Sequence, residues 1–153
     1  MNRIRTATLV AAIVASLGGL PYALAHTDAA LDTQKPPHGG QLRAAGAYHF
    51  ELVVAKDSAE AKDNPVLVYV TDHRGAAVPT AKTGGTATLL AGKTKTVIKL
   101  VPDGENRLKG VGRYASAPEM KAVVSVTFAD KSVEQARFTP LLRTTGAPAG
   151  PGQ

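Results

Sequence analysis

The sequence predicts an all-β protein, specifically an immunoglobulin-like β-sandwich of seven or eight short strands. From residue 38 onward, short runs of alternating apolar and polar residues follow one another, and clusters of Gly, Pro, Asn and Asp separate them. Outside residues 6–20, no segment keeps the 3.6-residue apolar period of an amphipathic helix. The chain has no Cys and no Trp, so the hallmark residues of immunoglobulin domains are missing and the prediction depends on the strand pattern.

The N-terminal residues 1–25 have the three parts of a secretory signal peptide: a short basic start, an apolar run and an Ala-x-Ala ending. An uncleaved anchor is the alternative, but the apolar run is shorter than the roughly 20 residues that span a bilayer. We therefore expect a periplasmic protein with no membrane span after processing. Its first residue would be His26, whose amine and imidazole together suit Cu(II), unless this residue is merely a mobile end. The polar residues 26–37 are expected to form an extended leader that ends in Pro36-Pro37.

Residues 38–142 are the predicted sandwich domain. Residues 41–45 are expected as a short edge strand, and residues 47–56 give the clearest alternation in the chain. A charged loop at 57–64 leads to the apolar run 66–71, which suits a central strand. The remaining expected strands are 76–80 (an edge strand, because of Pro79), 86–91, 94–101, 107–114, 121–129 and 133–141. Residues 143–153 are rich in Gly, Pro and Ala and are expected to form a disordered tail.

The candidate site begins at His38, which precedes the pair Gly39-Gly40, and continues in the strand that follows. His49 and Glu51 are two residues apart there, so a strand presents both on one face, with Cα atoms roughly 6.5–7 Å apart. The other face carries apolar residues for the core: Tyr48, Phe50, Leu52 and Val54. The alternative interpretation is that His49 and Glu51 are ordinary solvent-facing residues of a half-buried strand.

Asp72 and His73 follow the next strand, in the turn that ends at Gly75. Antiparallel pairing of sequential strands would bring this turn close to the start of the strand that carries His49. The sequence thus predicts a metal site with five candidate ligands: His38, His49, Glu51, Asp72 and His73. For Asp72 a second interpretation stays open, that of a turn residue whose carboxylate accepts nearby backbone N–H groups.

Imidazole and carboxylate ligands suit Zn(II), Cu(II), Ni(II) or Co(II), and we expect Cu(II) or Zn(II) most. Cu(I) prefers sulfur, but residues 26–153 contain no Cys and a single Met, Met120. Ca(II) requires a denser cluster of oxygen ligands than the sequence offers.

Other function classes have little in their favour. The net charge is +6, but the basic residues are dispersed and aromatic residues make up 5%, so no nucleic-acid surface is expected. The ATLLAGKT stretch at residues 87–94 fits a loose phosphate-loop pattern, although its bulky middle and the strand after it indicate a β-hairpin. No serine lies in a nucleophile-elbow motif, so we do not expect an enzyme.

Five stretches carry a resemblance to a known family: PPHGGQL, YHFELVV, VYVTDHRG, MKAVVSVTF and QARFTP. They resemble small periplasmic proteins encoded beside heavy-metal efflux systems, and modules at the N-termini of heavy-metal efflux adaptor proteins. The resemblance covers residues 36–140. It implies an immunoglobulin-like sandwich, periplasmic metal binding through the five candidates, and a heavy-metal efflux complex or its adaptor protein as partner.

The functional expectation is therefore a metal-ion chaperone or buffer in heavy-metal homeostasis or efflux. The alternative belongs to another class: a structural or assembly module that contacts a partner protein through an exposed strand edge. In that case the histidines have no role in the function.

Overall fold

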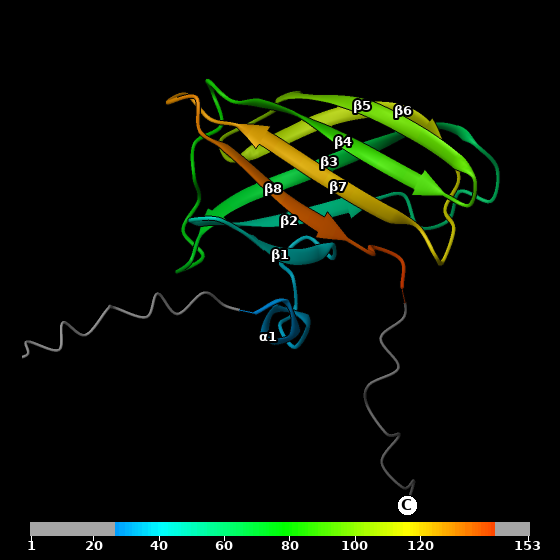
Figure 1. The fold of residues 1–153 in the computed structure, drawn as a ribbon, viewed down its shortest axis with the longest axis horizontal. Helices are drawn as coiled ribbons and strands as arrows, with labels where there is room; N and C mark the ends of the chain where they lie inside the picture. Colours follow the sequence, from blue (N-terminus) through cyan, green and yellow to red (C-terminus); the bar gives the residue numbers. More distant parts are fainter. Residues whose placement is uncertain (1–26, 143–153) are drawn as a thin grey trace, which may run out of the picture.

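A computed structural model describes residues 27–142, so the expected signal peptide, His26 and the expected C-terminal tail lie outside the described residues. The described part is all-β, with one short helix at its start (Figure 1). In chain order the elements are α1 (Asp28–Asp32), β1 (Gln41–Ala45), β2 (Tyr48–Val54), β3 (Lys62–Asp72), β4 (Gly84–Ala91), β5 (Thr94–Pro102), β6 (Arg107–Tyr114), β7 (Lys121–Thr127) and β8 (Val133–Phe138). In this part of the chain, no helix has the length and hydropathy needed to cross a membrane.

The all-β prediction is confirmed, but the immunoglobulin-like sandwich is not. The eight strands form one antiparallel sheet in the order β1-β2-β3-β6-β5-β4-β7-β8. Its two outer strands, β1 and β8, face each other. The backbone N–H of Thr139, just after β8, donates to Oε1 of Gln41 at the start of β1, and Nε2 of Gln41 donates to the Thr139 hydroxyl. The sheet is therefore nearly closed and barrel-like rather than two separate layers (Figure 1).

The junction between β5 and β6 closes the sheet where a sandwich would have a gap. β5 pairs with β4 over most of its length, and its last residues, Val101 and Pro102, pair with β6. Gly110 and Gly112 of β6 leave room for this close crossing, since a Cβ at either position would run into Ile98 of β5. Sequence alternation specifies which side chains face inward, but it does not specify whether neighbouring strands continue one sheet or begin another.

The core fills the interior of this sheet with one apolar set from all eight strands and the segments between them. Phe50 and Leu52 of β2 are fully buried, as the alternation predicts, and Val66, Val68 and Val70 of β3 join them. Tyr48 and Val54 also pack on the core side. The outward positions of β2 are thereby left to His49 and Glu51.

Three element predictions differ from the structure. The leader, predicted to be extended, contains α1, whose first turn is capped by the Thr27 side chain and whose Leu31 is buried. β3 begins at Lys62, inside the predicted loop 57–64. The expected edge strand at 76–80 is reduced to a single bridge between Thr71 and Ala77.

Candidate metal centre

His49 and Glu51 point outward from β2, yet they are 6% and 2% exposed. Their cross-strand neighbours on β3 are Thr71 and Tyr69, which also face outward. The segment between α1 and β1 lies over this face and contributes Pro37 and His38 to the same pocket. The two residues are therefore covered by the leader, and the interpretation of them as solvent-facing strand residues is wrong.

Glu51 is held by three hydrogen bonds from the His38-Gly39-Gly40 turn. Its Oε1 accepts the backbone N–H groups of His38, at 2.8 Å, and of Gly40, at 3.0 Å. Its Oε2 lies 2.7 Å from Nδ1 of His38. Because an ionised carboxylate can only accept, Nδ1 carries a proton and Nε2 is the ring nitrogen that this contact does not use.

The two glycines after His38 are required by this turn. Gly39 has a φ of +72°, in the left-handed region that glycine adopts without strain. At Gly40 a Cβ would collide with the backbone carbonyl of Leu52 in β2. Lys56 completes the turn by donating to the carbonyl of Gly39 at 2.6 Å. The Gly-Gly pair thus brings the His38 backbone close enough to β2 to reach Glu51.

Tyr69 forms the floor under His38 and was not predicted. The two rings are stacked in parallel with centroids 3.5 Å apart, and the guanidinium carbon of Arg107 lies 5.9 Å from the Tyr69 centroid. The available signal was positional: Tyr69 alternates with buried Val68 and Val70, so it faces outward beside Glu51. The apolar run 66–71 hid that alternation, because it was interpreted as covered on both faces.

His73 lies beside His49, an arrangement that the predicted antiparallel pairing allows but does not require. Their ring centroids are 4.7 Å apart, with an angle of 54° between the ring planes. Nε2 of His73 lies 3.1 Å from the carbonyl oxygen of Gly46, which can only accept, so this nitrogen donates. The turn after β3 and the turn before β2 therefore meet at the two imidazoles.

Asp72 does not join this group. Its Oδ1 accepts the backbone N–H groups of Arg74, at 2.8 Å, and of Ala76, at 2.9 Å. These bonds, with the one from Ala76 first, lower the pKa of Asp72 below its ordinary value of 3.8. Of the two interpretations that the sequence left open, the structure shows the turn residue.

A single pocket of about 280 Å³ brings four of the five candidates together: His38, His49, Glu51 and His73. Two basic residues, Lys35 and Arg74, also line this pocket, whereas Asp72 does not. Across residues 27–142, no three His, Cys, Asp or Glu side chains stand in an arrangement ready to hold a metal ion. The donor types, three imidazoles and one carboxylate, fit a transition metal, and both oxygens of the Glu51 carboxylate are held by the 38–40 turn.

Comparison with known proteins adds no relative. No family model matches the chain, and neither a curated protein nor a solved structure matches it. The functional argument therefore starts from the pocket itself.

Proposed function

We propose that this protein binds a divalent transition-metal ion, with Cu(II) or Zn(II) as the expected ions. The observation that carries the proposal is that three histidines, His38, His49 and His73, line one pocket, where the ring centroids of His49 and His73 are 4.7 Å apart. Neutral imidazole is the commonest protein ligand for these ions. A metal would be held by ring nitrogens of these residues, with small side-chain rotations on binding.

Glu51 would act on this metal through His38 rather than as a ligand. Histidines that bind metals usually donate their other ring N–H to a carboxylate or a carbonyl, which fixes the ring and raises its basicity. The contact between His38 Nδ1 and Glu51 Oε2, at 2.7 Å, has this form. The contact between His73 Nε2 and the Gly46 carbonyl, at 3.1 Å, has the same form. Both contacts restrict the rotation of the rings, which lowers the cost of ordering the ligands.

The cellular role that we propose is a periplasmic chaperone or buffer in heavy-metal homeostasis or efflux, with an efflux complex or its adaptor as partner. The signal-peptide pattern and the sequence resemblance support this part of the proposal. The alternative, partner binding through an exposed strand edge, has less support because α1 already lies along the outer edge of β1 (Figure 1). There the Asp28 carboxylate accepts a hydrogen bond from the backbone N–H of Ala44 at 3.4 Å.

Isothermal titration with Cu(II), Zn(II), Co(II) and Ni(II) tests the proposal. The chain should begin at His26 and carry His26→Ala, so that a terminal site does not obscure the pocket. Replacing His49 and His73 together with Ala should weaken binding at least about tenfold. Glu51→Gln should weaken it by about 10- to 100-fold, because it removes the carboxylate that orients His38.

Asp72→Asn is the matched control, because this residue lies next to His73 but outside the pocket. It should change the metal affinity less than about twofold. No binding tighter than about 100 μM by any of the four ions, or equal effects of the pocket variants and Asp72→Asn, would contradict the proposal. Thermal unfolding of each variant checks that the fold is kept.

A further inference from the structure

The outer face of β5, β4, β7 and β8 carries cations and exposed apolar side chains, and none of these four strands lines the metal pocket. These four strands are consecutive neighbours in the sheet, and they lie together in Figure 1. We call their outward side the basic face. Its charged residues are Lys95, Lys99, Lys121 and Arg137, all exposed.

No carboxylate occupies an outward position on these four strands within the described chain. Glu134 of β8 points to the other side of the strand, the side of Ala136, and its carboxylate lies against Gly46. Asp130 is confined to the turn between β7 and β8, where Oδ1 accepts from Ser132. The outward positions of these four strands therefore carry positive charges and no negative ones, although the whole chain has only a moderate net charge of +6.

Exposed apolar side chains gather on the same face. Six large apolar residues of the described chain are strongly exposed, and four of them stand on these strands. They are Leu90 (42%), Val97 (61%), Val101 (47%) and Val133 (59%). Strand register places Leu90 directly between Lys95 and Lys121, so the apolar and cationic groups alternate across the sheet.

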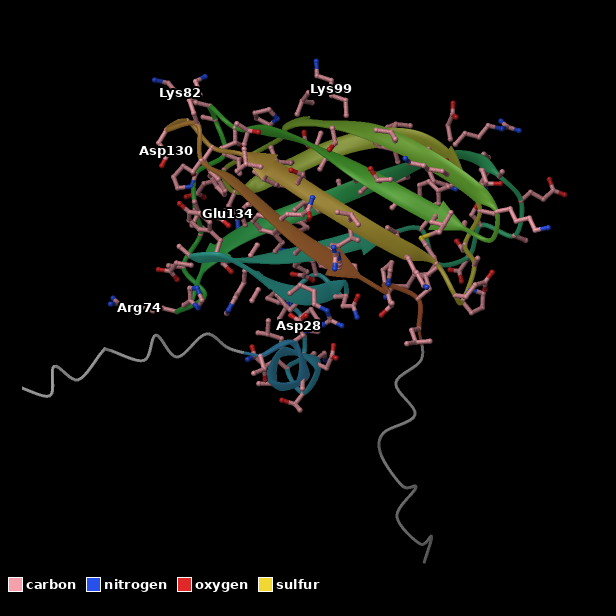
Figure 2. All side chains as sticks on the ribbon, in the orientation of Figure 1. Asp28, Arg74, Lys82, Lys99, Asp130 and Glu134 are labelled. Carbon is pink, nitrogen blue, oxygen red and sulfur yellow. The ribbon has the colours of Figure 1, made fainter. Side chains whose placement is uncertain are left out.

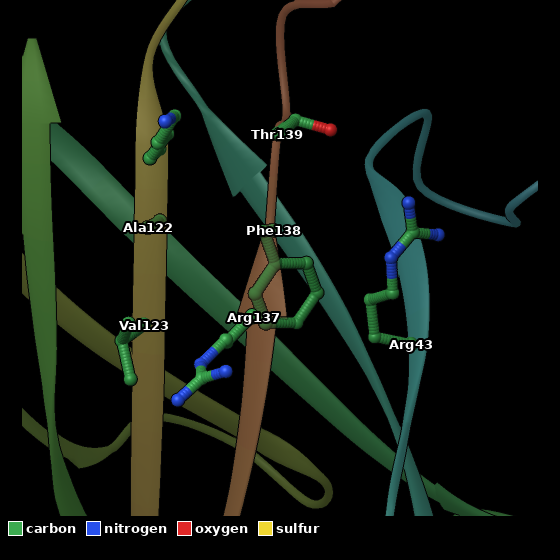
Figure 3. Close-up of a pocket in the computed structure, with 7 residues that line it drawn as sticks. Arg43, Ala122, Val123, Arg137, Phe138 and Thr139 are labelled. Atoms are coloured by element: carbon green, nitrogen blue, oxygen red, sulfur yellow. The ribbon is translucent and has the colours of Figure 1, made fainter.

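A shallow hollow of about 310 Å³ opens at the edge of this face, between β7, β8 and β1. Its floor is apolar, formed by Ala122, Val123 and Phe138, and Lys121 and Arg137 stand beside it. Figure 3 shows Arg137 next to Val123, with Arg43 on the far side of Phe138. Arg43 is already paired with Asp32 at 2.6 Å, so Lys121 and Arg137 are the cations that this hollow offers.

We propose that the basic face docks the protein onto an anionic lipid surface. Lysine side chains attract anionic headgroups, and the long stems of Lys let the ammonium reach phosphate while neighbouring valines contact the bilayer surface. An acidic protein partner fits less well. Protein interfaces are enriched in Tyr, Trp and Arg and depleted in Lys, whereas this face has three Lys, one Arg and no outward aromatic residue.

The protein would bind at the surface of the membrane and would not insert into its interior. The exposed apolar residues are short valines and one leucine on regular strands, and no Trp or Tyr on this face could anchor the protein at the depth of the headgroups. The association is therefore reversible and mainly electrostatic. It does not involve the metal pocket, whose residues lie on the leader, β1, β2, β3 and the turn after β3.

Co-sedimentation with vesicles tests this inference. The chain is used from His26 onward, because the apolar run 6–20 would itself bind lipid. Vesicles of phosphatidylcholine and phosphatidylglycerol in equal parts should bind it, and vesicles of phosphatidylcholine alone should not. Raising the salt from about 0.1 M to about 1 M should release it, because the Debye length shortens from about 10 Å to about 3 Å.

A matched pair of double variants separates the face from the overall charge. Lys99→Gln with Lys121→Gln should lower the vesicle affinity at least about tenfold. Lys62→Gln with Arg74→Gln removes the same charge from exposed positions at the start of β3 and in the turn after it, away from the basic face, and should change the affinity less than about twofold. Figure 2 shows Lys99 directed away from the sheet, so its replacement leaves the core intact. Val97→Ser should weaken binding by a smaller factor.

Equal losses in the two double variants would overturn the inference, because they would show attraction by net charge alone. Failure of the unaltered chain to bind anionic vesicles at low salt would also overturn it. If vesicles do not bind but soluble polyglutamate does, with the loss confined to the Lys99 and Lys121 variant, the occupant is an acidic polypeptide and not lipid.

Discussion

Glu51 and Asp72 are both carboxylates that accept two backbone N–H groups, but their surroundings give them different tasks. Glu51 is buried under the leader and also holds the His38 ring, so its hydrogen bonds link β2 to the candidate metal pocket. Asp72 stands in a turn after β3 and serves only that turn. A buried carboxylate needs such partners because an unpaired charge there would be costly, which is why Glu51 tolerates an exposure of 2%.

Asp72 gives a pH prediction at this scale. Its pKa is lowered in the folded chain from the ordinary 3.8 by the bonds from Ala76 and Arg74. Its contribution to the unfolding free energy is therefore complete well above pH 3.8 and is lost as the pH falls through the lowered value. Urea unfolding between about pH 6 and pH 2.5 should show a steeper acid loss for the unaltered chain than for Asp72→Asn. Parallel curves would contradict this assignment.

The residue pattern predicted part of the site. Alternation in β2 was enough to put His49 and Glu51 on one side and Phe50 on the other. It was not enough for Asp72, because an Asp before Arg-Gly suits both a turn and a ligand. Tyr69 was missed because a run such as VLVYV hides which side of the strand is covered. What covers the outer side is the leader, and its path depends on tertiary contacts with β1.

At the scale of elements, α1 is the anchor that fixes the leader. Its five residues are too few to show a helical period, so the sequence could not predict it as a helix. Tertiary contacts stabilise it instead: Leu31 is 1% exposed, and Arg43 of β1 pairs with Asp32 and, at 3.7 Å, with Asp28. Because Pro37 and His38 follow α1 and line the pocket, this anchor also holds one pocket wall.

Leu31→Ala and Asp32→Asn compare the two contacts that hold α1, which are the burial of Leu31 and the ion pair of Asp32 with Arg43. Loss of a buried Leu side chain costs about 2 kcal/mol or more, whereas a partly exposed ion pair contributes less than about 1 kcal/mol. Leu31→Ala should therefore speed hydrogen exchange in residues 28–40 strongly, with a smaller change in the strands, and Asp32→Asn should change it little. If the two variants exchange alike, the helix is held by charge and the role given to Leu31 is wrong.

For the whole molecule, the eight strands and their inward sets followed from periodicity, but closure into one sheet did not. A sandwich and a barrel-like sheet share the same alternation, and the difference lies in a few contacts between β5 and β6. The close crossing needs small residues at Gly110 and Gly112. In the sequence these glycines appear only as interruptions of a strand, and such glycines have several causes. Closure keeps β5 and β6 from being free edges, which would invite pairing with other chains.

Gly110→Ala tests this closure, with Gly112→Ala as its control. A Cβ at Gly110 meets the backbone carbonyl of Lys99 as well as the Ile98 side chain, and backbone cannot move aside without separating β5 from β6. A Cβ at Gly112 meets mainly the outer atoms of Ile98, which can change rotamer. Crowding of this kind costs about 1–3 kcal/mol, which exceeds the roughly 0.5–1 kcal/mol that Ala gains over Gly in a strand. Gly110→Ala should therefore lower the unfolding free energy by at least about 1 kcal/mol more than Gly112→Ala in urea titrations. An equal or smaller loss would mean that the β5–β6 crossing does not hold the sheet closed.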